Sequence, residues 1–582
     1  MSTLLKYTAL TSLLAITVPC HSTAIPTTAT PRLAHEVNQS VTLTPADIAD
    51  GYLYVGDGLP NETPGSLEDG QIADPSTIQF DHIGSAYIQP TYLPVPGAYY
   101  PGNTNILYNL TLANEQATSM SAPDQTGAPQ ASGNGTNSIN SISTGIYNST
   151  TMNIHYQTAF ELDSVPSVSY GTSNTSLTHT VYGTTKTYGY QCSLNNYTVC
   201  SAYYHDVQLT GLQSSTYYYY QINNDASGVN TSSIYTVKSP IAPGDSTPYN
   251  VTMYADMGMI NAGETRNGIL QLAKENVTEF ILHYGDISYA DAWSYSLYGL
   301  GSVNGGDSGN TYESSWDIWQ YWMNNITTIT PYMTAPGNHE VGCAEGDLGP
   351  VYCPFNQRNF TAYRNRFSMP GQASGAGDNS NMWYSFDYGI VHYVVLNSET
   401  DFEGAPEQAP LTPDYPNFEA GPFGGQNSNT PTQTQWLQSD LAAVNRSVTP
   451  WIIVGAHRPM YTSEPGNGGY TKPLRKAWES LFIEYGVDAY FAGHIHWYER
   501  IYPQNNGTTV VSAVTAVNNF TCSGSGNDDS ATTYITIGSA GNIENHSNDP
   551  RTPFLDASLD FSHYGFGQLQ VCVHRIHINI WY

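Results

Sequence analysis

Five apolar stretches in the second half of the chain each end in side chains that can bind a metal ion. The stretches are YNVTMYAD, EFILHYGD, YMTAPGNHE, PWIIVGAH and DAYFAGHIH. In layered α/β folds, ligands bind at the carboxyl ends of the strands. The pattern therefore predicts an α/β domain that gathers these side chains at one edge of its sheets. The ligand candidates are Asp256, Asp286, Tyr289, Asn338, His457, His494 and His496, and His339 lies beside Asn338.

The last of these stretches places two histidines one residue apart. In extended backbone, the side chains of His494 and His496 point the same way. Neutral imidazole is a common ligand of Zn, Cu, Fe and Ni. Glycines precede Asp286, Asn338 and His494, and they allow a sharp turn as the backbone leaves the sheet. A single such element is usually structural, but the joint occurrence favours a metal site.

Between these stretches the chain predicts amphipathic helices over 263–276, 432–447 and 472–486, the last ended by Gly486. Strands that alternate with helices indicate a layered α/β domain over 249–504, which strands in 505–582 complete. The stretches 297–312 and 400–431 lack periodicity and are predicted to be long loops that cover the functional site.

The region before Pro248 has a different pattern. Short alternating strands between 150 and 238 predict a β-sandwich within 91–245, and Tyr218 is the candidate for a tyrosine corner. Residues 112–145 are low in complexity and predict a flexible insertion, while 25–90 predict a loop-rich arm.

The first 24 residues are typical of a secretory signal, with Lys6 before a short apolar core. The mature chain then has six cysteines; local spacing favours the pairs Cys192–Cys200 and Cys343–Cys353, which leaves Cys522–Cys572. Together with the many N-x-S/T sequons, this predicts a secreted, extracellular glycoprotein. The sequons include Asn109, Asn174, Asn276, Asn359 and Asn445.

The charge balance is acidic, with 17 Lys+Arg against 48 Asp+Glu and a net charge of −31. Such a surface repels nucleic acid and anionic membranes, so neither is an expected partner. A phosphorylated substrate would also be repelled and would need local positive charge. Bound metal ions would supply that charge at the predicted site.

The donor set favours two metal ions rather than one. Seven ligand candidates exceed the three or four that a single tetrahedral zinc takes, and two-metal sites are common among phosphatases and nucleases. The mixture of oxygen and nitrogen donors without sulfur favours Fe, Zn or Mn. A phenol with an ordinary pKa of about 10 ligates in acid only to a strong Lewis acid, so Tyr289 favours Fe(III).

The motifs ADMG, GDISYADAW, PGNHE, VGAHRPMY and GHIHWYER, in this order, closely resemble the purple acid phosphatases of the metallophosphoesterase superfamily. The resemblance runs from about residue 150 to the C-terminus. It implies a layered αββα metallophosphoesterase sandwich, preceded by an all-β, fibronectin-III-like sandwich domain.

The resemblance also implies a role for each site residue. Fe(III) would be held by Asp256, Tyr289 and His496, and Asp286 would bridge the two ions. A divalent ion (Zn, Mn or Fe) would be held by Asn338, His457 and His494. His339, beside Asn338, would face the substrate phosphate and assist the leaving group.

Two departures from the family pattern stand out. Ala255 replaces a usual glycine, and the segment after His457 contains no histidine to bind substrate from outside the metal shell. Arg458, Glu544 and His546 are the remaining candidates for substrate contact, although a structural role is the simpler expectation for each.

The expected function is hydrolysis of phosphate monoesters by a hydroxide activated at an Fe(III)–M(II) centre, with an acidic pH optimum. The alternatives are a two-metal phosphodiesterase or nucleotidase, a peroxidative iron protein, and a non-enzymatic secreted glycoprotein. Small phosphorylated molecules are the expected substrates; phytate, nucleotides, sugar phosphates and phosphoproteins all stay open, as does the oligomeric state.

Overall fold

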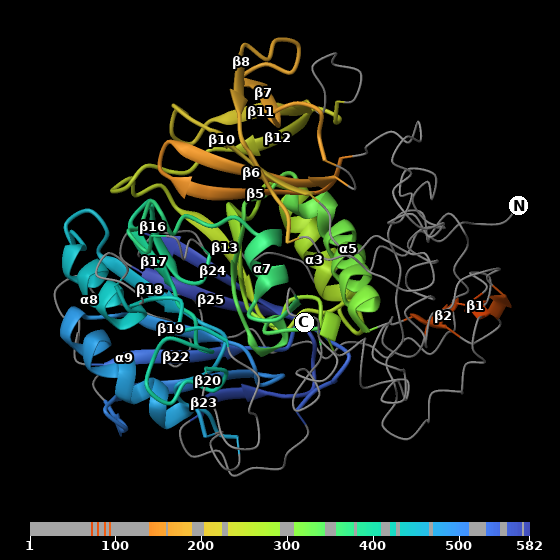
Figure 1. Cartoon of the computed structure of the whole chain (residues 1–582). Coiled ribbons are helices and arrows are strands. Elements are labelled where there is room, and N and C mark those ends of the chain that lie inside the picture. The colour runs from red at the N-terminus through yellow and green to blue at the C-terminus, as the bar shows by residue number, and fades with distance from the viewer. Residues whose placement is uncertain are drawn as a thin grey trace, which may run out of the picture. The chain divides into compact units, whose positions relative to one another are not determined.

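The computed structural model describes the sandwich region and the second half of the chain in most of their length (Figure 1). The described residues are 71–73, 78–80, 86–88, 92–94, 139–158, 161–188, 203–223, 231–291, 308–343, 357–377, 381–408, 420–425, 431–464, 469–510, 531–547, 556–572 and 575–582. The predicted signal segment and Cys192, Cys200, Cys353 and Cys522 lie outside them.

Four short strands lie in or beside the predicted loop-rich arm. Strand β1 (Gln71–Ala73) pairs with β4 (Tyr92–Pro94), and β2 (Ile78–Phe80) pairs with β3 (Ala86–Ile88), both antiparallel.

Two four-stranded antiparallel sheets form the predicted β-sandwich. The first has the order β5-β6-β10-β9, with β5 Asn140–Asn148, β6 Thr151–Thr158, β10 Tyr203–Leu209 and β9 Thr184–Lys186. The second has the order β12-β11-β7-β8, with β12 Tyr235–Lys238, β11 Tyr217–Asn223, β7 Ser167–Gly171 and β8 His179–Tyr182.

The sandwich core follows the alternation of the strands. Along β11, every second residue from Tyr218 is buried, and Tyr220 and Ile222 pack in one cluster with Ile154 and Val207 of the other sheet. The Tyr218 hydroxyl accepts a hydrogen bond from the backbone N–H of Gln213 at 2.9 Å. This is the contact expected of a tyrosine corner.

Strand β5 corrects the predicted insertion. The strand begins at Asn140, whereas composition predicted flexible chain from 112 to 145. Ile142 and Ile146 are both buried, and Thr144 donates a hydrogen bond to the carbonyl of Thr327 at 3.1 Å. The Ser/Thr-rich composition of this stretch resembles that of a flexible segment. The small polar side chains of the strand are nevertheless buried, because they form hydrogen bonds with neighbouring groups.

Two sheets form the centre of the α/β domain. The first has the order β15-β14-β13-β24-β25, with β15 Tyr332–Ala335, β14 Phe280–Tyr284, β13 Tyr249–Tyr254, β24 Phe566–Cys572 and β25 Arg575–Trp581. The second has the order β16-β17-β18-β19-β22-β20-β21, with β16 Tyr384–Tyr388, β17 Val391–Val395, β18 Trp451–Gly455, β19 Ala489–Ala492, β22 Thr532–Ile537, β20 Tyr498–Asn505 and β21 Thr508–Thr509. Strand β23 (Asp556–Asp560) pairs with β20.

Aromatic side chains join the two sheets face to face. Phe280 of β14 contacts Phe386 of β16 and Tyr393 of β17, with ring centroids 5.6 and 5.2 Å apart. Tyr284 of β14 stacks on Phe491 of β19 at 6.2 Å. The facing rings pack the two sheets against each other.

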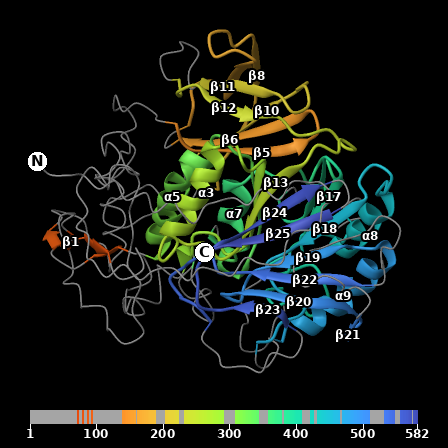
Figure 2. The ribbon, with the colours of Figure 1, turned by 180° about the vertical axis from the view of Figure 1, so that it is seen from behind.

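Helices cover the outer faces of the two sheets. Helices α3 (Gly263–Lys274) and α5 (Ser308–Thr327) lie on one side of the sheets, and α8 (Gln433–Ala443) and α9 (Thr471–Tyr485) on the other, as both views show (Figures 1 and 2). The described residues also include a short helix α7 (Thr361–Arg366) and a 3-10 turn at Asn338–Glu340. The layered αββα architecture expected from the sequence is therefore present.

Helix α9 ends as expected, at Gly486 with a φ of 66°. Helix α5, in contrast, begins at Ser308, inside the stretch 297–312 that was predicted to be a loop. Its buried residues include Tyr312, Trp316, Trp319 and Met323. These follow the helical spacing of three and four, so the sequence did contain a signal that the polar first turn obscured.

Helix α5 also attaches the β-sandwich to the α/β domain. The Tyr220 hydroxyl of β11 donates to the carbonyl of Thr328 at 2.8 Å, just after the helix. The fully buried Arg366 pairs with Glu313 and Asp317 of α5 at 2.7 and 2.6 Å. Its guanidinium also lies over the ring of Tyr204 in the sandwich, 5.4 Å from the centroid.

Cys343 and Cys572 are each disulfide-bonded. Because their expected partners lie outside the described residues, the predicted pairing stays a prediction. Within the described part of the chain, no helix has both the length and the apolar character to cross a membrane.

Candidate metal centre

The carboxyl ends of the parallel strands converge on one site. Strands β13, β14 and β15 are mutually parallel in the first sheet, and β17, β18, β19 and β22 are parallel in the second. The segments that leave these strands deliver the seven ligand candidates, which are Asp256, Asp286, Tyr289, Asn338, His457, His494 and His496.

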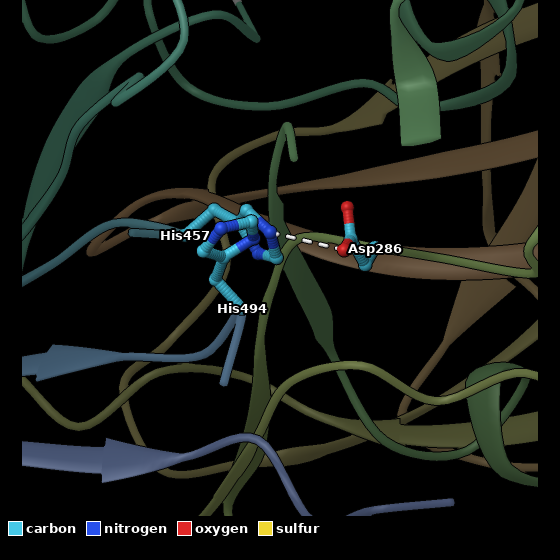
Figure 3. Close-up of side chains that lie close together, drawn as sticks. All are labelled: Asp286, His457 and His494. Atoms are coloured by element: carbon cyan, nitrogen blue, oxygen red, sulfur yellow. Dashed lines mark ion pairs between the residues drawn. The ribbon is translucent and has the colours of Figure 1, made fainter. Parts of the chain in front are cut away.

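One group of donors surrounds Asp286 (Figure 3). The Nε2 atom of His457 lies 3.0 Å from Oδ2 of Asp286 and 3.0 Å from Oδ1 of Asn338. Asp286, His457 and His494 each offer one ligand atom, and these atoms lie within 4.8 Å of one another. Four of the expected ligands thus share one cluster.

The other group surrounds Tyr289. Its hydroxyl oxygen lies 3.3 Å from Oδ1 of Asp256 and 3.1 Å from Nε2 of His496. The Nδ1 atom of His496 contacts the backbone carbonyl of Asn545 at 2.8 Å. That contact fixes Nδ1 as the donor and turns Nε2 toward Tyr289 and Asp256.

Backbone contacts join the two groups. The backbone N–H of His494 donates to both carboxylate oxygens of Asp256, at 3.0 and 2.8 Å. The backbone N–H of Asp256 donates to the carbonyl of Gly285 at 3.1 Å, directly before Asp286. The structure therefore brings all seven side chains into one contiguous set.

The local backbone is strained where the ligands sit. Asp256, Asp286, Tyr289 and His494 have φ values of 61°, 52°, 54° and 69°, a region that non-glycine residues seldom adopt. For a ring as large as that of Tyr289 this conformation is rare, and such strain typically marks functional sites.

Two glycines are required by space rather than by φ. A Cβ at Gly337 would lie 2.3 Å from Oδ1 of Asp286, and a Cβ at Gly493 would lie 2.3 Å from Oδ2 of Asp256. Any side chain at either position would therefore displace a carboxylate from the site.

The donors around Asp286 fit a cation. The Nδ1 atom of His457 donates to the carbonyl of Tyr284 at 3.0 Å, so the neutral ring presents a lone pair at Nε2. That lone pair faces one carboxylate oxygen and one amide oxygen, and three electron-rich atoms are stable together only around positive charge. A metal ion meets this need, and without one the Asp286 carboxylate outweighs burial and raises the pKa of His457 to about 9.

The phenol of Tyr289 and the carboxyl of Asp286 differ in how readily they lose a proton. Burial and the nearby Asp256 and Asp286 carboxylates raise the pKa of Tyr289 well above its usual range. Although burial opposes it, the neighbouring histidines hold the pKa of Asp286 well below its usual range. Asp286 is therefore ready to bind a metal, whereas Tyr289 becomes phenolate only beside a strong Lewis acid.

His339 lies at the edge of this set with its ring oriented. Its Nδ1 atom lies 2.9 Å from both carboxylate oxygens of Asp291, and its backbone N–H donates to Oδ1 of Asp286 at 3.0 Å. Its Nε2 atom lies 3.5 Å from Oε1 of Glu544 and 3.8 Å from Oδ2 of Asp286. Against the effect of burial, Asp291 and Asp286 raise the pKa of His339 well above its usual range.

Glu340 is a buried residue beside the candidate site that the strand-end pattern did not single out. Its carboxylate accepts the backbone N–H groups of Asp286, Ile287 and Gly337 at 2.9, 2.8 and 2.7 Å, and it is fully buried. It thereby ties together the two loops that follow β14 and β15. Its position directly after His339 in the motif was the available signal.

The loop after β22 also contributes, and the sequence reasoning gave it only weak candidates. Asn542 donates from Nδ2 to the Tyr289 hydroxyl at 3.0 Å and to the carbonyl of Asp256 at 3.2 Å. Glu544 faces His339, as described above. The signal was the same as for the other strands, since the apolar run TYITIG ends in the loop SAGN.

The other two weak candidates have internal partners. The Arg458 guanidinium donates to Glu399 at 2.8 Å, to Glu407 at 3.3 Å and to Nε2 of His494 at 2.9 Å. The His546 ring stacks on Tyr564 with centroids 3.8 Å apart. Arg458 thus contacts a candidate ligand and the wall of the site, whereas His546 contacts a neighbouring aromatic ring.

Three profiles of known protein families match this chain. Residues 139–239 match the purple acid phosphatase N-terminal domain, 255–498 match the calcineurin-like phosphoesterases, and 531–580 match the C-terminal part of iron/zinc purple acid phosphatase-like proteins.

Two fungal relatives are similar over most of their lengths. An acid phosphatase of Aspergillus ficuum is 38% identical over 524 residues, covering 76% of this chain and 84% of the relative. Acid phosphatase A of Cryphonectria parasitica is 33% identical over 425 residues, covering 65% of this chain and 76% of the relative.

Among solved structures, a purple acid phosphatase from yellow lupin (Lupinus luteus) seeds superposes with a TM-score of 0.56 at 21% identity. It covers 75% of this chain and 70% of the lupin chain. This similarity supports the shared fold.

Proposed function

The chain belongs to the purple acid phosphatase family and is an acid phosphatase, and from this premise we propose that it hydrolyses phosphate monoesters at an Fe(III)–M(II) centre outside the cell. The observation that carries the proposal is the convergence of Asp286, His457 and His494 on one point, beside Tyr289 and His496.

The proposed ligand assignment follows the two donor groups. Asp256, Tyr289 and His496 would hold Fe(III), since the phenol has a high pKa and needs the stronger Lewis acid. The remaining ligands, with Asp286 as the bridge, would hold a divalent Zn, Mn or Fe ion; they are Asn338, His457 and His494. When bound, the two ions supply charge that neutralises the substrate phosphate and Lewis acidity that activates water.

The proposed catalytic residue is His339. Its Nδ1 is paired with Asp291, so Nε2 is the atom turned toward the reacting groups. With its pKa raised by Asp291 and Asp286, the ring is protonated in acid and can give the Nε2 proton to the departing alkoxide. General-acid help of this kind is typically worth about 10²–10⁴ in rate.

Glu544 lies near the Nε2 atom of His339, the atom proposed to donate the proton. Its Oε1 lies 3.5 Å from Nε2 of His339, and its side chain is 35% exposed, so it can contact both the ring and an entering substrate. Small phosphorylated molecules fit this site better than nucleic acid or membranes, because the net charge of −31 repels extended anions.

The direct test compares Asp286→Asn with Asp440→Asn. Asp440 is a partly buried carboxylate of α8 that pairs with His392 at 3.0 Å and takes no part in the metal centre. With p-nitrophenyl phosphate at acidic pH, Asp286→Asn should lose at least about 10³-fold in kcat together with bound metal. Asp440→Asn should keep wild-type kcat.

Retained activity in Asp286→Asn would contradict the proposal. A diester such as bis(p-nitrophenyl) phosphate distinguishes the proposed monoesterase from a phosphodiesterase, because a phosphodiesterase would hydrolyse the diester faster than the monoester.

A further inference from the structure

A cavity of about 250 Å³ lies between the β-sandwich and the α/β domain, away from the metal centre. This volume is slightly below the range of about 300–1,000 Å³ that is usual for small-ligand pockets. Its walls are formed by β11 and β12 of the sandwich, by the end of α3, and by the segments before β14 and β15. The lining residues include Tyr217, Lys238, Ala273, Asn276, Glu279 and Pro331.

One lining residue, Asn276, starts the N-glycosylation sequon Asn276-Val277-Thr278. Asn276 is exposed and has a φ of 55°. Its backbone N–H donates to the carbonyl of Ala273 at 3.1 Å, and that of Val277 donates to Leu272 at 2.9 Å, which together make a Schellman cap on α3. The cap prefers glycine at this position, so asparagine here is the second choice for the backbone.

The cavity wall has the chemistry that binds a sugar ring. The Tyr217 side chain is 43% exposed, one of the few large apolar side chains so exposed among the described residues. A tyrosine face covers the C–H face of a sugar well, because both are apolar there and polar at the rim. Beside it, Lys238 pairs with Glu279 at 2.6 Å, which offers a donor and an acceptor for hydroxyl and acetamide groups.

We propose that Asn276 carries an N-linked glycan whose first N-acetylglucosamine occupies this cavity and joins the β-sandwich to the α/β domain. The sugar is attached to the cavity's own wall, so its binding is intramolecular and benefits from a high effective concentration. The inference rests on the proposed export of the chain, because only exported chains receive N-glycans.

The first test is glycopeptide mass spectrometry of the secreted, full-length enzyme from a eukaryotic host, with Asn174 and Asn445 as reference sequons. Asn276 should be occupied. Its glycan should resist peptide-N-glycosidase in the native protein and be released after denaturation, because the first sugar is enclosed. Both reference residues are exposed, and glycans there should be released from the native protein.

An empty Asn276 beside an occupied reference sequon overturns this inference and leaves the phosphatase function intact. Release from native Asn276 as fast as from the reference sequons also overturns it. Secreted, active enzyme without a glycan at any sequon overturns this inference and leaves the phosphatase function intact.

The second test measures thermal unfolding. Asn276→Gly removes the glycan and supplies the residue that the cap prefers, so any direct effect on the backbone should raise the melting temperature. We expect instead a fall of roughly 2–4 °C, typical of a lost contact in a large domain, with unchanged kcat. Thr278→Ser is the matched control, since it retains the sequon and the buried hydroxyl that accepts from the Thr252 N–H at 3.0 Å.

Tyr217→Ser completes the experiment. It should lower the melting temperature in the glycosylated enzyme and have little effect in the Asn276→Gly background, since the two changes remove one contact. A melting temperature that does not fall in Asn276→Gly, or equal effects of Tyr217→Ser in both backgrounds, overturns the assignment.

Discussion

At the scale of single residues, Glu340 shows how the metal centre depends on a side chain that touches no metal. Its carboxylate accepts three backbone N–H groups from two loops, and these loops carry Asp286 and the Asn338–His339 pair. Loss of this buried acceptor would leave three backbone donors unpaired and would release both loops together.

We therefore expect Glu340→Gln to lower kcat or metal affinity by roughly 10–100-fold, because an amide NH₂ would face a backbone N–H in place of an oxygen. The measurement is kcat together with bound metal per chain. Glu479→Gln is the control, since Glu479 is also buried and accepts the Asn506 backbone N–H at 3.0 Å, but on α9. Wild-type kcat and full metal content in Glu340→Gln would show that the site does not need the hydrogen bonds accepted by Glu340.

At the scale of elements, a buried histidine joins α8 to the edge of the second sheet. His392 of β17 pairs with Asp387 of β16 at 2.7 Å and with Asp440 of α8 at 3.0 Å. Burial alone would lower the pKa of His392, but the two carboxylates raise it to about 9. Because the pKa is higher in the folded state than the usual value of about 6.5, the stabilisation is complete below that pH and fades as pH rises through about 9.

The corresponding prediction concerns His392→Gln. Relative to wild type, the variant should lose on the order of 2 kcal/mol more stability at pH 5.5 than at pH 9.5. Melting temperatures of both proteins at the two pH values measure the difference. The ion-pair interpretation would be contradicted if the difference in melting temperature between wild type and variant stayed constant or grew toward pH 9.5.

The elements also show what the sequence could and could not predict. The helices near α3, α8 and α9 and the strand ends were readable, because their apolar periodicity reflects burial that is local in sequence. Strand β5 and helix α5 were missed where Ser, Gly and Asn masked that periodicity.

The candidate site also contains both residues that the sequence could predict and residues that it could not. Its seven ligand candidates follow directly from strands and could be named in advance. Asp291 and Glu340, however, act through contacts with His339 and with backbone N–H groups that only the folded chain creates. Chain-local patterns carry no information about such contacts.

At the scale of the whole molecule, the net charge of −31 opposes the approach of phosphorylated substrates. Salt screens this repulsion, since the Debye length falls from about 30 Å at 0.01 M to about 8 Å at 0.15 M ionic strength. We expect kcat/KM for a small phosphate monoester to rise several-fold over this range of an inert monovalent salt, with kcat nearly constant. A fall in kcat/KM with salt would indicate that local positive charge already governs substrate capture.

We propose for the molecule that seven side chains from five loops meet around one pair of ions, one of them Fe(III) held by a phenolate. Metal analysis combined with the visible spectrum of purified protein tests this most directly. We expect two metal ions per chain and a charge-transfer band that disappears in Tyr289→Phe while the iron stays bound. A single ion per chain, or a band that survives in Tyr289→Phe, would contradict it.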